Sequence, residues 1–108
     1  MAGIGKTFIR IPSRYRKDEV IEVKTRIVHP NHNGRQKDKM GEYIAAHYIR
    51  KIEVHYGEVR VISMDASAGL SQNPYFTFAL KAARAAPLRV VWVDTLGQEF
   101  SKTVEINV

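Results

Sequence analysis

Hydrophobic side chains recur at every second position in several segments, and this pattern constrains the fold more than any other feature. In the clearest case, residues 20–28, charged side chains alternate with a row made of Ile21, Val23, Thr25 and Ile27. Such alternation is typical of a β-strand with one face on a core and the other in water. Similar alternation occurs at 48–56, 76–80 and 100–108, and more weakly at 7–11, 59–64 and 89–93. The sequence therefore predicts about seven strands.

Turn-forming residues separate these segments and leave little room for helix. Turn signals lie at 30–41, 56–58, 65–74 and 94–97, and the second and fourth of these are short enough for tight hairpins. Only residues 80–86 have helix-forming composition, but Pro87 closes this segment after seven residues, too few for a stable helix. We interpret 80–86 as the end of one strand followed by a turn or a short helix.

Short strands separated by turns predict an all-β protein, an immunoglobulin-like two-sheet β-sandwich of about seven antiparallel strands. A length of 108 residues favours one domain, so we expect residues 1–5 to form a loose N-terminal arm and residues 6–108 to form the sandwich. Trp92 has apolar neighbours on both sides and is expected in the core. No window approaches about 18 consecutive apolar residues, so we expect no membrane-spanning helix.

The chain carries a formal net charge of +6, and the whole excess falls in its first half. Residues 1–60 contain 13 Lys and Arg against 7 Asp and Glu, whereas residues 61–108 contain 4 of each kind. The basic residues gather in two clusters, one at Arg14, Arg16 and Lys17 and the other at Arg35, Lys37 and Lys39. A basic surface attracts acidic proteins, nucleic acid or small anions, although solubility alone would also explain the charge.

Metal binding finds little support in the residue pattern. The chain has no cysteine, which excludes a disulfide, a thiolate metal site and a catalytic thiol within it. A site made of three histidines would require the 29–32 loop to fold onto the strand that His47 precedes, and no metal-binding motif supports it. We expect His29 instead to anchor its loop by hydrogen bonds, and we expect no metal or other cofactor.

Catalysis is equally unsupported, so we expect this chain not to be an enzyme. Its carboxylates lie on outward strand positions or near turns, as at Asp38 and Asp94, where an Asp often accepts hydrogen bonds from backbone N–H groups. The Gly-x-Ser-x-Gly elbow of a serine nucleophile is missing. Two classes of binding function remain, a protein-binding module and a nucleic-acid-binding module.

The nucleic-acid alternative is a small basic β-domain that binds a single strand. Aromatic side chains at Tyr75, Phe76 and Phe78 could stack bases, as they do on RNA-binding sheets. However, Phe76 and Phe78 share one face with Leu80, which is typical of a core face, and no RNP-type motif is present. We therefore favour protein binding and expect neither nucleic acid nor a membrane as a partner.

Two long polar segments, residues 29–49 and 64–78, are the best candidates for a docking surface. Loops of this length in a small domain usually carry function. The candidate docking residues are His29, Pro30, Gly34, Arg35, Lys37, Asp38, Lys39, His47, Asn73, Pro74 and Tyr75.

Short motifs in these segments occur in a specific order. They are His29-Pro30, Gly34, Lys37-Asp38, the run Ala-His-Tyr-Ile at 46–49, Ser71-x-Asn73-Pro74-Tyr75 before Phe78, and Trp92-Val93-Asp94 followed by Gly97. In this order and spacing the chain resembles the SoxZ family, the small subunits of the SoxYZ carrier complex of bacterial thiosulfate oxidation. One position departs from the family pattern, because Gln36 stands where an arginine often precedes Lys37.

The resemblance implies an immunoglobulin-like sandwich and a non-catalytic role. SoxZ proteins are partners of SoxY, whose C-terminal Gly-Gly-Cys-Gly-Gly arm holds sulfur intermediates on its cysteine. A chain without cysteine would then bind SoxY in a heterodimer and help present the loaded arm to other Sox enzymes, with the basic residues 34–39 recruiting enzymes or anionic sulfur intermediates. The family also implies a periplasmic location and export together with SoxY, because no signal peptide is visible in the sequence.

Overall fold

The structure, a computed structural model, describes residues 5–30, 32, 34–66 and 73–108. Within these residues the chain forms strands and turns but no helix, and so no helix that could span a membrane. The strands are β1 (Thr7–Arg10), β2 (Val20–Ile27), β3 (Ile49–Tyr56), β4 (Val59–Asp65), β5 (Tyr75–Lys81), β6 (Ala86–Asp94) and β7 (Glu99–Ile106). All seven predicted segments are therefore confirmed as strands.

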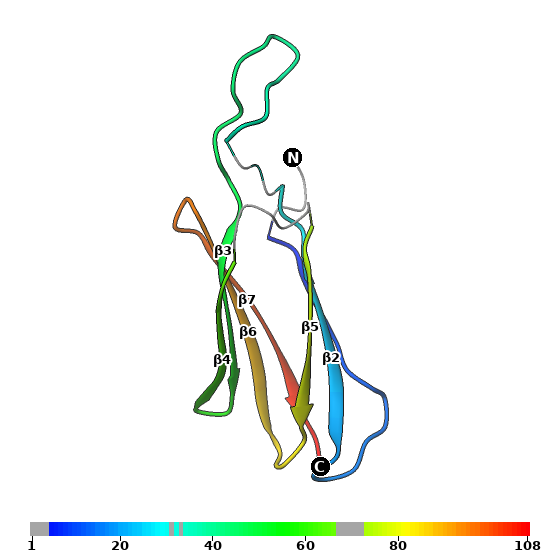
Figure 1. Cartoon of the computed structure of the whole chain (residues 1–108). Helices are drawn as coiled ribbons and strands as arrows, with labels where there is room; N and C mark the ends of the chain where they lie inside the picture. The colour runs from blue at the N-terminus through cyan, green and yellow to red at the C-terminus, as the bar shows by residue number, and fades with distance from the viewer. Residues whose placement is uncertain (1–4, 31, 33, 67–72) are drawn as a thin grey trace.

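The strands form two antiparallel sheets that face each other (Figure 1). The smaller sheet has the order β1-β2-β5 and the larger one the order β4-β3-β6-β7. Strands β1 and β7 contact each other across the sandwich along one side. The molecule is elongated, with principal extents of 55 × 23 × 20 Å. The predicted immunoglobulin-like β-sandwich is confirmed.

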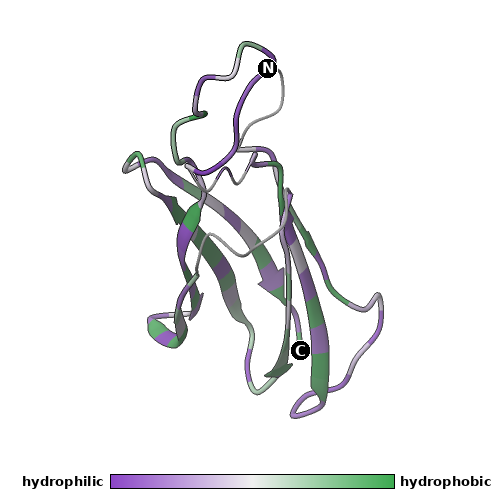
Figure 2. Cartoon of the chain, turned by 45° about the horizontal axis from the view of Figure 1, so that its top comes forward, coloured by the Kyte–Doolittle hydropathy of each residue, from purple (hydrophilic) through white to green (hydrophobic). Residues whose placement is uncertain are grey.

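The core lies between the sheets and takes one side of each strand. Along β2, the predicted row of four side chains is buried while Glu22 and Lys24 point to solvent. Hydrophobic and hydrophilic bands accordingly alternate along the strands in Figure 2. Trp92 is fully buried on β6, an inner strand of the larger sheet, as predicted. Each large apolar side chain removed from water in this way stabilises the fold by about 1.5–3 kcal/mol.

The turn between β5 and β6 differs from the helix that its composition allowed. Strand β5 ends at Lys81, and β6 already begins at Ala86, which pairs with Ile106 of β7. The side chain of Tyr56 holds the turn, because its hydroxyl donates to the Arg84 carbonyl and accepts from the Arg84 N–H at 2.9 Å. The alternative of a strand end followed by a turn is thus confirmed, and cross-sheet contacts override the helical composition.

Residues 34–46 leave the sandwich as a narrow hairpin-like loop, which we call the finger (Figure 1). Its two limbs are joined by the pairing of Lys37 with Tyr43 and by a bond from the Ile44 N–H to the Gln36 carbonyl at 2.8 Å. At the tip, Asp38 Oδ1 accepts from the N–H groups of Met40 and Glu42, at 2.9 and 3.1 Å. Asp38 therefore closes a turn, as its residue type predicts.

Some predicted features fall outside the described residues. Of the N-terminal arm predicted at 1–5, only Gly5 is described, and its N–H donates to the Val28 carbonyl at 2.9 Å. Residues 67–72, which include Ser71 of the second long segment, are also outside the described part. The division into an arm and one domain stays a prediction.

Candidate functional site

Three polar side chains meet at the end of the sandwich from which the finger projects. His29 follows β2, His47 lies just before β3, and Asp94 is the last residue of β6. Strands β3 and β6 are antiparallel neighbours in which Ile49 pairs with Asp94, so the start of one and the end of the other lie together. We call these three residues the His–Asp–His cluster.

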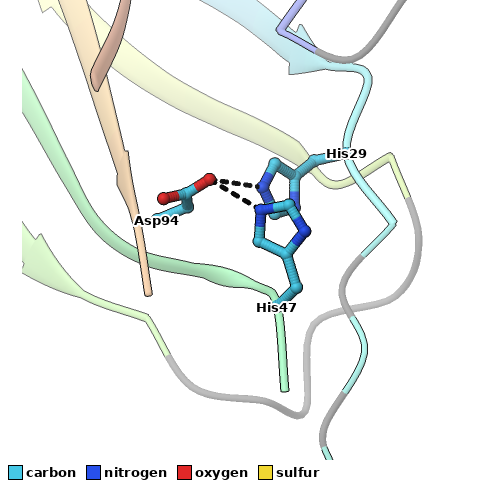
Figure 3. A group of neighbouring side chains, drawn as sticks. All are labelled: His29, His47 and Asp94. Carbon is cyan, nitrogen blue, oxygen red and sulfur yellow. Dashed lines mark hydrogen bonds and ion pairs between the residues drawn. The ribbon is translucent and has the colours of Figure 1, made fainter. Parts of the chain in front are cut away.

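Both imidazoles of the cluster point at the same carboxylate oxygen (Figure 3). Asp94 Oδ2 accepts from His47 Nε2 at 2.8 Å and from His29 Nε2 at 3.1 Å. The two rings meet edge to face, with centroids 4.4 Å apart and planes inclined by 71°. Because an ionised carboxylate only accepts hydrogen bonds, each imidazole here carries a proton on Nε2.

The other oxygen of Asp94 is held by the turn that follows β6. Oδ1 accepts from the N–H groups of Leu96 and Gln98, at 3.0 and 2.8 Å. Burial alone would raise the pKa of the Asp94 carboxyl, but hydrogen bonds from His29, His47 and these two N–H groups together lower its pKa below the ordinary 3.8. Asp94 is therefore ionised at neutral pH although it has no exposed surface.

Backbone bonds fix the two histidines in place. The His29 N–H donates to Asn73 Oδ1 and the Asn73 N–H donates to the His29 carbonyl, both at 2.9 Å. His32 and His47 exchange two backbone hydrogen bonds, at 2.7 and 2.8 Å, across the root of the finger. His29 is completely buried, whereas the His47 side chain is 18% exposed. The cluster thus connects both long segments singled out in the sequence and opens to solvent on the His47 side.

The structure brings some of the predicted docking residues into this cluster and keeps others at the surface. His29, His47 and Asn73 come together, and the expectation that His29 anchors its loop by hydrogen bonds is confirmed. Pro74 is buried beside them, and its carbonyl accepts from the Ile27 N–H at 3.4 Å. His29 and Pro74 therefore offer a partner no direct contact in this conformation.

The charged docking candidates lie on the finger. Arg35, Lys37, Asp38 and Lys39 are all exposed there, while Pro30 and Gly34 are partly buried near its root. Gly34 has a φ of +84°, and a Cβ on it would lie 3.3 Å from that of Ala46, so glycine suits this position. The exposed tip also carries two large apolar side chains, Met40 and Tyr43.

Tyr75 lies elsewhere, on the solvent-facing side of the smaller sheet. The strand pairing places Phe8, Arg26 and Tyr75 in one line across β1, β2 and β5, and we call them the aromatic row. The Arg26 guanidinium lies 4.4 Å from the centre of the Phe8 ring and 5.8 Å from that of Tyr75. Phe8 is 37% exposed and Tyr75 71% exposed, and a groove beside them is lined also by Arg10 and Lys24.

The nucleic-acid alternative loses two of its three candidate aromatic side chains in this arrangement. Phe78 is buried in the core and Phe76 packs against it, with ring centres 5.4 Å apart, so neither is available to stack bases. The basic clusters at 14–17 and 35–39 are separated by β2, whose eight residues span about 26 Å. A titration with single-stranded oligonucleotides at low salt, where phosphate contacts are strongest, is expected to show no binding.

Sequence comparison identifies the family. The family model described as "Sulphur oxidation protein SoxZ" matches residues 9–105, nearly the whole chain. The chain belongs to the SoxZ family. This membership gives the chain a role in sulphur oxidation, confirms the resemblance found in the sequence motifs, and agrees with the expectation of a non-catalytic subunit.

Solved structures share the fold of this SoxZ-family chain. A superoxide reductase (neelaredoxin) of Ignicoccus hospitalis, in its T24K variant, is 24% identical, with a TM-score of 0.76 over 99% of this chain and 82% of that one. A putative superoxide reductase of Thermotoga maritima is 17% identical, with a TM-score of 0.70 over 94% and 84%. The sulfur carrier protein SoxY of Chlorobium limicola f thiosulfatophilum is 15% identical, with a TM-score of 0.64 over 94% and 74%. A search of curated proteins gives no significant match.

Proposed function

We propose that this chain is the non-catalytic subunit of a SoxYZ heterodimer, which binds SoxY and helps present cysteine-bound sulfur intermediates to Sox enzymes during thiosulfate oxidation. The observation that carries the proposal is the SoxZ family match over residues 9–105. The absence of cysteine agrees with it, because the sulfur must then be carried by the partner. Together with SoxY, the chain is proposed to work in the periplasm, which fractionation of the native cells would test.

The aromatic row is the surface we assign to SoxY. Tyr and Arg are enriched among the residues that dominate binding energy at interfaces, and Phe8 adds apolar area beside them. The row crosses all three strands of the smaller sheet, so a partner can lie flat on it. A stable heterodimer needs about 1,200 Å² or more of buried surface, which a sheet face of this kind can supply with its surrounding loops.

The finger is the surface we assign to the Sox enzymes. Its exposed basic residues Arg35, Lys37 and Lys39 attract acidic surfaces, and charges at the rim of an interface act mainly on the rate of association. The finger projects beyond the end of the sandwich, and the aromatic row lies near that same end, on the outer face of the smaller sheet (Figure 1). In this proposal an enzyme engages the exposed tip of the finger while SoxY occupies the sheet face beside its root.

Co-expression with the SoxY of the same organism, followed by size-exclusion chromatography, tests the function directly. We expect one complex containing both chains, and a chain that stays monomeric beside folded SoxY would refute the proposal. Within a complex, the double substitution Phe8→Ala and Tyr75→Ala should weaken binding by about thirtyfold or more, which corresponds to about 2 kcal/mol. Val59→Ala and Val61→Ala remove exposed apolar side chains from β4 and serve as the matched control. Binding that survives the first pair unchanged would place SoxY on another surface.

A further inference from the structure

The His–Asp–His cluster has the ligand set of a metal site. Two imidazole nitrogens and one carboxylate oxygen, supplied by His29, His47 and Asp94, all lie within 4.8 Å of one another. Nitrogen and oxygen ligands without a thiolate suit Zn²⁺ and the neighbouring divalent metals of the first transition series. The geometry points to a divalent metal site of this class, with Zn²⁺ as its reference ion, at the end of the sandwich.

The distances in the cluster are close to those that such an ion needs. Tetrahedral Zn²⁺ with bonds of about 2.0–2.1 Å keeps its ligand atoms about 3.3 Å apart. The Nε2–Oδ2 distances here are 2.8 Å for His47 and 3.1 Å for His29. These two distances would lengthen by a few tenths of an ångström to admit the ion, and the two imidazole nitrogens lie within 4.8 Å of each other. Coordination through Nε2 requires each neutral imidazole to hold its single proton on Nδ1, so metal binding replaces the two hydrogen bonds to Asp94.

Outer contacts already orient the carboxylate for this role. The N–H groups of Leu96 and Gln98 occupy Oδ1 of Asp94 and direct Oδ2 toward both imidazoles. Such outer-shell bonds fix the ligands of metal sites and contribute to affinity. The backbone pairing of His47 with His32 fixes the main chain that carries the second imidazole. Three ligands on separate elements are thus positioned without further folding.

Charge and access also favour an ion. The cluster places a completely buried carboxylate between two imidazoles, and a divalent cation would compensate the charge of such a carboxylate directly. His29 and Asp94 have no exposed surface, whereas His47 is 18% exposed. An ion can therefore reach the cluster past His47, the ligand that is open to solvent.

Titration calorimetry on the full chain, purified without a tag and stripped with a chelator that is then removed, tests the site. We expect one Zn²⁺ per chain. His47→Gln and Asp94→Asn should weaken binding by roughly 100-fold or more, because loss of even an outer-shell partner costs 10–100-fold. His55→Gln is the matched control, since His55 pairs at 3.5 Å with Glu53 outside the cluster and should leave the affinity unchanged. Absence of binding, or unchanged affinity in His47→Gln, would overturn the inference and leave a hydrogen-bonded cluster only.

A second measurement on the unmodified chain avoids any dependence on the folding of the variants. Addition of Zn²⁺ should shift the imidazole NMR signals of His29 and His47 and leave those of His55 in place. Co²⁺ should give the intense visible absorption of a four-coordinate ion. Shifts at His32 or His55 without shifts at His29 would place the ion elsewhere and refute the site. The size-exclusion step of the SoxY-binding experiment is run with chelator in the buffer, so its outcome is independent of this result.

Discussion

Replacing Asp94 by alanine and by asparagine distinguishes the two structural roles of this carboxylate, one in the turn after β6 and one in the His–Asp–His cluster. Oδ1 closes the turn after β6, and Oδ2 accepts from the two buried imidazoles. Alanine removes all four hydrogen bonds. Asparagine keeps an oxygen in the position of Oδ1, and its NH₂ group can donate to an imidazole nitrogen once the tautomer changes. The alanine variant therefore loses both sets of hydrogen bonds, whereas the asparagine variant loses only the negative charge.

The size of each effect follows from which groups lose a partner. In Asp94→Ala the buried Nε2–H of His29 loses its bond to Asp94, while water can reach the backbone N–H groups of Leu96 and Gln98, which are exposed residues. A hydrogen bond to a charged group contributes about 1.5–3 kcal/mol, and two imidazoles lose such a bond, so we expect a loss of about 3–5 kcal/mol. Asp94→Asn exchanges charge-assisted bonds for neutral ones and should cost about 1–2 kcal/mol.

Urea unfolding followed by tryptophan fluorescence measures both losses. The chain contains a single tryptophan, Trp92, which is fully buried two residues before Asp94 and reports on the same end of β6. The experiment is done with chelator so that only the metal-free protein contributes. For a domain of this size the alanine variant should also melt about 12–20 °C below the parent.

Two results would refute this reasoning. Equal losses in the two variants would mean that the turn bonds to Oδ1 contribute nothing beyond the cluster. A loss below about 1 kcal/mol in Asp94→Ala would mean that the buried imidazoles do not depend on the carboxylate. Glu99→Ala is the control, because Glu99 is exposed, lies close by and only pairs with Arg89 at 3.9 Å. Such exposed ion pairs contribute at most about 1 kcal/mol.

The remaining predictions concern pH, encounter with enzymes and the turn before β6. Because folding lowers the pKa of Asp94, the contribution of this carboxylate to the free energy of unfolding is fully present above pH 3.8 and is lost as the pH falls through the lower folded pKa. Acid unfolding of the parent, compared with that of Asp94→Asn, measures this loss. Lys37→Glu with Lys39→Glu should slow association with Sox enzymes in stopped-flow mixing while the SoxY complex elutes unchanged; loss of that complex would place the finger in the SoxY interface. Tyr56→Phe removes both hydroxyl bonds to Arg84 and should lower the free energy of unfolding by about 2 kcal/mol in urea, and an unchanged midpoint would contradict the role of this hydroxyl.

Most of the fold follows from the sequence because each strand buries one face. Alternation identifies β2 together with the side chains that it buries, and it places the other six strands close to their observed positions. Strand ends are less predictable. Strand β6 begins at Ala86, three residues before the predicted segment 89–93, because its first residues pair with β7. That pairing depends on the position of a neighbour and leaves no local signal around Pro87.

The candidate site is predictable only in part, for a related reason. The anchoring role of His29 and the turn-closing role of Asp94 follow from residue type and local context. Asp94 contacts two histidines that are distant in the chain, since His47 is separated from it by 47 residues and His29 by 65. It depends on the pairing of β3 with β6, which are not consecutive strands. The available signal was that each of the three residues stands at a strand end, and it becomes informative only once the strand order is known.

Besides its place in the cluster, His47 forms part of the root of the finger. Both limbs of the finger leave the sandwich through the paired backbones of His32 and His47, so a single pair of peptide groups sets the direction of the whole projection. Each limb of about six residues reaches at most about 20 Å, and a rotation of only about 10° at the root therefore moves the tip by about 3 Å. The point about which the finger would rotate lies beside the buried carboxylate of Asp94. A small rotation at this pair of residues, next to the buried Asp94, would therefore appear as a larger displacement at the tip.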